Sequence, residues 1–262
     1  MRRGELFWGG LLVILGVLFF LQAAGYLTGD VFGWFWPIFI ILLGIWVLSG
    51  GYARRSRFAA AGEFSIPLQG ATEATLAIDH GAGRMLLRSN ANPGDFLTGV
   101  MAAGMNHSEW HDGDKLLVRL EAGPSLIPVL GPEDGIWEFR LNRDVPIALS
   151  IHSGASSLDL DLTELHVTSL AFDGGASRLN LSLPARVQNA VANIRAGAAR
   201  IEIKVPAGVA LRFRANGAGR LVIDETRFPR SEEGSYQSAD YTSAQYHADV
   251  TVDGGASSVR IY

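Results

Sequence analysis

A Gly-Ala pair followed by alternating apolar and polar residues occurs six times along the chain. When the copies are aligned on that glycine, apolar residues stand four and six positions later, with a mostly polar residue between them. This period of two is typical of a β-strand that is buried on one face. The apolar residues are Met85, Leu158, Leu179, Ile201, Leu221 and Val259 at the fourth position and Leu87, Leu160, Leu181, Ile203, Ile223 and Ile261 at the sixth.

The spacing of the copies predicts a stacked repeat. The four copies from Gly154 to Gly217 are 21, 22 and 20 residues apart, and a fixed period in this range is typical of solenoids. Each copy predicts a strand, a Gly-Ala turn and a second strand, and neighbouring copies stack about 4.8 Å apart around one core. The predicted turn residues are Gly81 and Ala82, Gly154 and Ala155, Gly175 and Ala176, Gly197 and Ala198, Gly217 and Ala218, and Gly255 and Ala256.

We expect the turn glycines to provide either positive φ angles or close backbone approach, and the alanines to fill tight space inside the turn. Three residues before the glycine, five copies carry an apolar residue, whereas the copy at Gly217 carries Arg214. Its apolar residues, Leu211 and Phe213, are displaced by one position, which predicts a bulge or a register slip.

An insertion at about residues 90–145 separates the first copy from the others. Within it, Asp112 and Gly113 predict a hairpin with a primed turn. Alternation predicts strands at 115–120 and 136–141, and three prolines predict a loop over 123–135. The region from 63 to 262 is therefore expected to be an all-β, solenoid-like soluble domain.

Two apolar runs at the N-terminus predict a membrane hairpin. Residues 6–27 and 31–48 are each long enough for a helix to cross a bilayer, and only a short turn joins them. A signal peptide is the alternative for the first run, but its apolar region is normally shorter and is not followed at once by a second one. The predicted organisation is a transmembrane hairpin at 1–53, a basic linker at 54–62 and the β-domain.

The distribution of arginine predicts the topology of this hairpin. Arg2 and Arg3 flank one end, Arg54, Arg55 and Arg57 flank the other, and the connecting turn carries only Asp30. Basic residues favour the cytoplasmic side, so the chain is expected to be a multi-pass protein of the cell membrane with both termini in the cytoplasm.

Charge and composition narrow the classes of partner. The net charge is −4, and residues 1–57 contribute +3, so the remainder carries −7. An acidic soluble part argues against a nucleic-acid partner, which needs a basic surface. The chain has no cysteine, which excludes disulfides, thiolate metal sites and cysteine nucleophiles.

Three patterns that could carry chemistry are better explained as structure. His107 and His111 could share a metal only on a helix, and their setting before a hairpin predicts a polar surface segment instead. The Gly-x-Gly sequences, such as the one at Gly217, precede a strand, so the helix N-terminus that holds a phosphate is missing. Asp159 and Asp161 share one strand face, which we interpret as solvated because nothing indicates a cleft. We therefore expect no enzymatic activity, catalytic residue, cofactor or metal.

Two further stretches resemble a known family. The apolar run 34–46, WFWPIFIILLGIW, looks like a LiaI/LiaF-type transmembrane module. The run 137–146, WEFRLNRDVP, followed by Gly-Ala-Ser repeats and the closing GGASSVRI, is similar to the toast-rack domain of LiaF-like proteins. This resemblance covers nearly the whole chain. It implies a non-enzymatic membrane protein of the bacterial cell-envelope stress response, and LiaF-like members restrain a membrane histidine kinase. Some LiaF proteins have more membrane segments than the one hairpin predicted here.

The resulting hypothesis is a membrane-anchored sensor, scaffold or regulator in the envelope stress response that acts by protein-protein contact. Its expected partners are the lipid bilayer and another membrane or signalling protein, with a histidine kinase as the family's example. A homo-oligomer is also left open. The alternative is an extracytoplasmic structural or adhesin-like solenoid on a membrane anchor, which requires the opposite topology.

Overall fold

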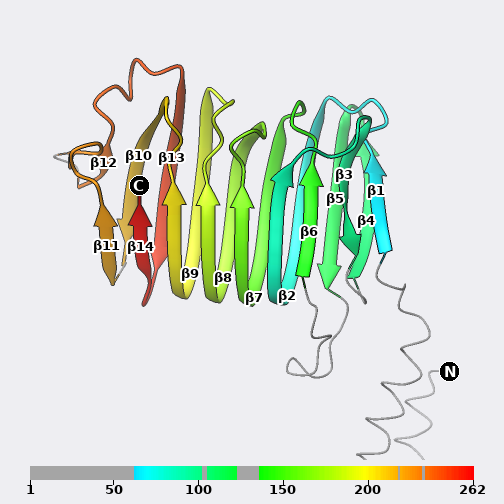
Figure 1. Ribbon diagram of the computed structural model, residues 1–262, viewed down its shortest axis with the longest axis horizontal. Helices are drawn as coiled ribbons and strands as arrows, with labels where there is room; N and C mark the ends of the chain where they lie inside the picture. Colours follow the sequence, from blue (N-terminus) through cyan, green and yellow to red (C-terminus); the bar gives the residue numbers. More distant parts are fainter. Residues whose placement is uncertain (1–61, 102–104, 123–135, 218, 232–233) are drawn as a thin grey trace, which may run out of the picture. The chain divides into compact units, whose positions relative to one another are not determined.

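The computed structural model describes residues 62–101, 105–122, 136–217, 219–231 and 234–262. These residues form fourteen strands in one sheet, with the strands lying side by side (Figure 1). No helix among them has the length and apolar character that a membrane crossing needs. The predicted hairpin at 1–53 lies outside the described residues, as does the linker up to residue 61.

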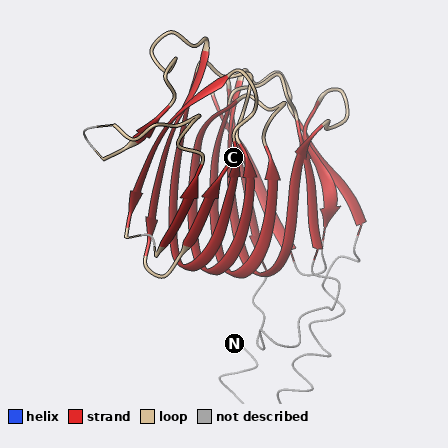
Figure 2. Ribbon diagram, turned by 60° about the vertical axis from the view of Figure 1, so that its left-hand side comes forward, coloured by secondary structure: helices blue, strands red, loops and turns tan. Residues whose placement is uncertain are grey.

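Bent strands make up most of the domain. Each one runs down one side of the molecule, curves through a Gly-Ala pair and returns up the other side (Figure 2). We call one such bent unit a rung. In four rungs the strand continues through the corner, namely in β2 (Glu73–Ser89), β7 (Ile147–Asp161), β8 (Val167–Ser182) and β9 (Asn189–Lys204). The prediction of two strands joined by a turn is thus corrected to one bent strand.

Neighbouring rungs pair in parallel and in register. Ala82 lies opposite Ala155, and Ala155 lies opposite Ala176, although the insertion separates the first two in the sequence. This pairing aligns the apolar columns predicted from the sequence. Met85, Leu158 and Leu179 are fully buried, and the core fills the space between the two sides. The all-β, solenoid-like fold predicted from the sequence is confirmed for the described residues.

The rungs do not follow the order of the chain. The last rung, β13 (Tyr246–Gly254) and β14 (Ser258–Ile261), lies between β9 and the rung that precedes it in the sequence. That displaced rung consists of β10 (Val209–Asn216) and β11 (Arg220–Ile223) and lies near the end of the sheet. In keeping with this position, Leu221 and Ile223 are only partly buried.

The insertion supplies a further rung. β5 (Lys115–Ala122) pairs with the first half of β2, and β6 (Ile136–Leu141) pairs with its second half. Antiparallel strands extend both sides, namely β4 (Met105–Asp112) beside β5, and β3 (Asp95–Met101) and then β1 (Gly62–Pro67) beside β6. The predicted hairpin is confirmed, because β4 and β5 are joined by Gly113, with a φ of 60°, and Asp114.

The displaced apolar residues before Gly217 have a simple cause. Asn216 pairs with Asp253 and Arg220 pairs with Ser258, so three residues lie between the paired positions in one rung and four in the other. The predicted register slip is therefore a corner that is shorter by one residue. Gly217, with a φ of 73°, adopts a left-handed conformation that favours glycine.

Residues 224–231 and 234–245 cap the end of the sheet beside β10. Phe228 is fully buried, and Tyr236 of β12 (Tyr236–Gln237) packs against Phe213. Ser238 pairs with Leu211 twice, since its backbone N–H donates to the Leu211 carbonyl and its hydroxyl accepts from the Leu211 N–H, both at 2.8 Å. Terminal caps of this kind shield the open end of a solenoid core.

Close backbone contact explains the glycines inside the stack. A Cβ added at Gly154 would lie 2.7 Å from the carbonyl oxygen of Gly81, and one at Gly175 would lie 3.0 Å from that of Gly154. The corresponding distances are 3.4 Å at Gly197 and 3.2 Å at Gly255, both to carbonyl oxygens of neighbouring corners. Of the two explanations left open by the sequence, close approach applies at Gly154, Gly175 and Gly255, and both apply at Gly217, where a Cβ would lie 2.7 Å from the Gly254 carbonyl oxygen.

A pair of glycine substitutions tests this explanation. Gly154→Ala should destabilise the domain by about 1–3 kcal/mol, because the new methyl group forces neighbouring backbones apart. Gly81→Ala is the matched control, since a Cβ there meets nothing within 4 Å, and it should change stability by less than about 0.5 kcal/mol. Urea unfolding of both variants measures the difference. Equal effects of the two substitutions would contradict the proposed role of close approach.

Candidate functional site

The Gly-Ala corners form an exposed ridge. Ala82, Ala155, Ala176, Ala198 and Ala256 are all exposed, which corrects the expectation that they fill tight space inside a turn. Of the twelve predicted corner residues, Ala218 lies outside the described residues. The ridge therefore consists of glycines held by backbone contact and alanines that face solvent. No side chain on it is longer than a methyl group, so a partner could approach the backbone closely.

The inner side of the corner carries a small polar cluster. His80 is only 3% exposed, and its Nδ1 lies 3.5 Å from the hydroxyl of Ser153, which in turn contacts the hydroxyl of Ser156. The imidazole packs edge-on against Trp137, with ring centroids 4.7 Å apart. Burial lowers the pKa of His80 to about 4, because the charged form loses hydration. The buried ring is therefore neutral near pH 7.

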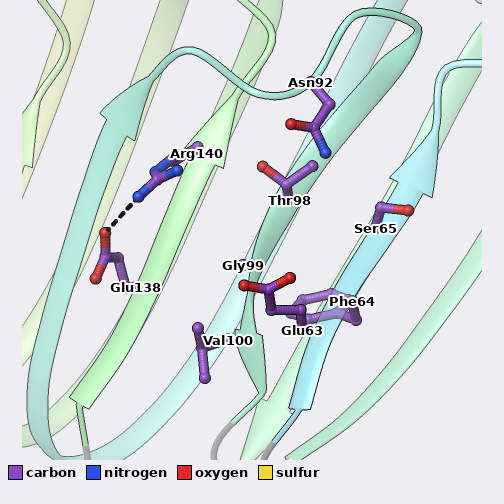
Figure 3. Close-up of a pocket in the computed structure, with 9 residues that line it drawn as sticks. All are labelled: Glu63, Phe64, Ser65, Asn92, Thr98, Gly99, Val100, Glu138 and Arg140. Atoms are coloured by element: carbon purple, nitrogen blue, oxygen red, sulfur yellow. Dashed lines mark hydrogen bonds and ion pairs between the residues drawn. The ribbon is translucent and has the colours of Figure 1, made fainter.

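A shallow groove lies on the outer face of β1, β3 and β6 (Figure 3). Its volume of about 310 Å³ is at the lower end of the range for small-molecule sites. Glu138 and Arg140 form an ion pair of 3.3 Å at its edge, and both side chains are about half exposed. The lining residues are Glu63, Phe64, Ser65, Asn92, Thr98, Gly99, Val100, Glu138 and Arg140.

Gly99 allows the sheet beneath this groove to pack tightly. A Cβ there would lie 2.7 Å from the ring of Phe139 and 3.3 Å from that of Phe64. These two rings, on the strands either side of β3, meet edge to face with centroids 6.1 Å apart. The groove therefore borders a rigid strand set, and the polar side chains around it offer hydrogen bonds rather than a deep apolar cavity.

Charge is divided unequally between the two outer sides of the stack. The strand halves after the corner carry eight basic and four acidic side chains, whereas the halves before the corner carry five basic and six acidic ones. The basic residues after the corner are Arg84, Arg88, Arg140, Arg178, Arg200, Lys204, Arg220 and Arg260, and the acidic ones are Glu138, Asp159, Asp161 and Glu202. One side of an acidic domain is therefore basic.

Four of these arginines occupy one line across the sheet, which we call the arginine row. Arg84 lies opposite Ser157, Ser157 opposite Arg178, and Arg178 opposite Arg200. Arg200 lies opposite Ser258, which lies opposite Arg220. All four arginines are exposed, and within the described part of the chain none has a carboxylate oxygen within 4 Å.

Arg212, before the corner, is in a different situation. It donates two hydrogen bonds to Asp249, of 2.7 and 2.8 Å, and Asp249 also accepts a 2.7 Å bond from the hydroxyl of Tyr241. Burial, followed by the bond to Asp249, raises the pKa of Tyr241 to about 12. This network fixes the cap to the sheet, so Arg212 has a structural role that the arginine row lacks.

The candidate chemistry weighed from the sequence lies on the surface. His107 and His111 belong to the exposed strand β4, which confirms the polar surface segment. No group of three or more histidines and carboxylates among the described residues could hold a metal. Asp159 and Asp161 alternate with the buried Leu158 and Leu160 on the outer side of β7, as expected for a solvated strand face.

The arginine row was not among the predicted site residues, although its arginines recur in the aligned repeat copies. Each of its arginines stands three residues after the corner glycine, one position before the first apolar column. The same alignment therefore contained the signal. Its linear arrangement, however, follows only from the observed pairing, because the chain order of the rungs differs from their order in the sheet.

Comparisons with known proteins agree with this architecture. A family model described as the N-terminal domain of toast_rack, DUF2154, matches residues 56–204. The match ends with β9, before the last two rungs. No curated protein matches the sequence.

One solved structure is similar in fold. It is the crystal structure of a candidate cell adhesion protein from Clostridium sporogenes, with a TM-score of 0.69 and 16% sequence identity. The similarity covers 77% of this chain and 98% of that protein. At this level of identity, the comparison establishes the shared fold alone.

The buried imidazole generates a prediction about pH. Unfolded histidine binds a proton near pH 6.5, whereas folded His80 does so near pH 4, so the unfolded state holds more protons between these values. Stability should therefore fall by roughly 2 to 3 kcal/mol from pH 7 to pH 4.5 through this group. In His80→Phe, which keeps a ring against Trp137, this part of the slope should be absent.

Urea unfolding at several pH values measures the slope. His111→Gln is the matched control, because it removes an exposed histidine and should leave the pH dependence unchanged. If His80→Phe retained the full slope, burial of His80 would not be its cause.

Proposed function

Because this chain belongs to the toast-rack family, we propose that it is a membrane-anchored, non-enzymatic scaffold that acts by protein-protein contact in the bacterial cell-envelope stress response. The observation that carries the proposal is the rigid display of exposed side chains on the outer sides of an in-register stack. A surface of this kind offers many fixed contact points to a partner, as extended repeat surfaces do in other solenoids.

The proposed anchor is the pair of apolar runs at 6–27 and 31–48, directly before the region matched by the family model. The resemblance of residues 34–46 to LiaI/LiaF-type modules supports a role beside a membrane signalling protein, for which a histidine kinase is the family's example. Arginines at both ends of the hairpin support a cytoplasmic location for the β-domain.

Cell adhesion is the second candidate function, and the Clostridium sporogenes structure favours it. That protein shares the fold over most of this chain, and its name assigns it to adhesion. The two candidates make opposite demands on topology, because an adhesin must present its domain outside the cell. Location is therefore the property that separates them.

Site-specific labelling should decide between them. Because the chain has no cysteine of its own, only the introduced residue can react. We expect Ser169→Cys, on the exposed outer side of β8, to resist a membrane-impermeant maleimide in intact cells and to react after permeabilisation. Asp30→Cys, in the predicted turn between the apolar runs, is the control and should react in intact cells. Reaction of Ser169→Cys but not of Asp30→Cys in intact cells would establish the adhesion topology.

Crosslinking should identify the partner. Chains crosslinked in cells and captured from a detergent extract should retain a membrane or signalling protein, with more of it recovered when the envelope is stressed. Capture after deletion of residues 1–53 provides the control for contacts that need the proposed anchor. Recovery of no such protein, with or without stress, would count against the scaffold role.

A further inference from the structure

The arginine row is a straight cationic line on an otherwise acidic domain. It crosses β2, β7, β8, β9, β14 and β11, which places Arg84 and Arg220 five strand spacings apart, or about 24 Å. Arg178 and Arg200 are direct neighbours at its centre. Holding guanidinium groups side by side without carboxylate partners is electrostatically unfavourable, so an anion that follows the line would relieve their repulsion.

Acidic side chains border the row on both sides. Asp159 and Glu202 follow it by two residues on the same outer face. On the strand halves before the corner, Asp79, Asp173 and Asp253 each lie five residues before a position of the row. They share one line across the sheet with His152 and Arg195, which lie between them. The row is therefore the line of this side with the most arginines, and carboxylates lie in the lines next to it.

This geometry selects among anionic partners. A flat bilayer pressed against the corner would meet the acidic borders as well as the arginines, so a thin chain fits better than a surface. A single-stranded nucleic acid would need aromatic side chains to stack its bases, and the row contains only arginine and serine besides Ile136 at its end. The partner that fits is a single chain with repeated anionic groups and no bases.

The use of arginine at all four positions indicates a partner that presents paired oxygen acceptors, as phosphate does. The guanidinium fork binds phosphate oxygens through two parallel hydrogen bonds, whereas lysine offers a point charge. A phosphate in a flexible chain presents free oxygens in several directions, so it can meet guanidinium groups at unequal spacings. Ser157 and Ser258 lie between the arginines and add hydroxyl donors.

We propose that the arginine row binds a linear phosphate polymer, laid along the corner of the stack. The adjacent ridge of exposed alanines and glycines leaves the approach open. Binding of this kind requires no particular compartment, so it stands independently of the scaffold and adhesion functions.

Inorganic polyphosphate is the probe, with the full-length chain held in an uncharged detergent. A fluorescent polymer long enough to span the row should bind, and tripolyphosphate should bind far more weakly because it reaches few of the arginines. Arg178→Gln together with Arg200→Gln should weaken polymer binding by about tenfold or more. Because each lost phosphate contact removes about 0.7 from the slope of log affinity against log salt, the slope should fall by about 1.4.

Arg88→Gln together with Arg260→Gln is the matched control, since it removes the same charge from exposed positions outside the row on the same side of the stack. This variant should lose less than about twofold in affinity. Equal losses in the two double variants, equal binding of tripolyphosphate, or no binding at all would overturn the proposal. If polyglutamate bound as tightly as polyphosphate or more tightly, the ligand would be a carboxylate polymer and the proposal would be wrong. If phosphatidylglycerol vesicles bound as tightly or more tightly, the ligand would be a membrane surface.

Discussion

Contact between backbones at the corner is the constraint on which this structure depends. At Gly154, Gly175, Gly217 and Gly255 the corner glycine lies against a carbonyl oxygen of a neighbouring corner, and a side chain there would separate the strands. Register is thus fixed at one point in these rungs. Because side chains alternate along a strand, fixing that point also fixes which residues enter the core and which form rows on the outer surface. The buried columns and the arginine row have the same origin.

The sequence predicted the repeated features because every copy of the repeat carries the same pattern of residues. The apolar columns, the glycine corners, the slip before Gly217 and the hairpin at Gly113 all follow from local pattern. The sequence could not predict which rung lies beside which, because every rung presents the same columns and the pairings are nearly interchangeable. The place of β13 between β9 and β10, and the formation of a rung by the insertion, depend on such pairings.

The prediction that the alanines fill space inside the turn was wrong for a related reason. The recurrence of alanine indicated that the side chain at this position must be small. The pattern alone does not tell whether that limit applies on the inside or the outside of the turn. The candidate surface shows the same limit. The arginines recur visibly in the alignment, whereas the line that they form exists only after the rungs are ordered. The residues at each position of the repeat could therefore be predicted from the sequence, but their arrangement in space could not.

Net charge is a poor guide to this domain. Acidic residues are concentrated in loops and end strands, while the strand halves after the corner carry an excess of basic side chains. Since electrostatic interactions at moderate salt extend only about 10 Å, a partner senses the side that it approaches and not the sum. An acidic protein can therefore present a basic surface to an anionic partner and still repel it elsewhere.

The position of β13 and β14 has a consequence for how the protein is made. The strands on either side of them, β9 and β10, are translated earlier but pair with each other only through this later segment. A nascent chain therefore has a gap in its sheet until residues 246–261 have left the ribosome, and during that time two strand edges are open to wrong pairing. Cooperative folding is then delayed until the gap closes, which makes this domain a candidate for chaperone assistance during synthesis.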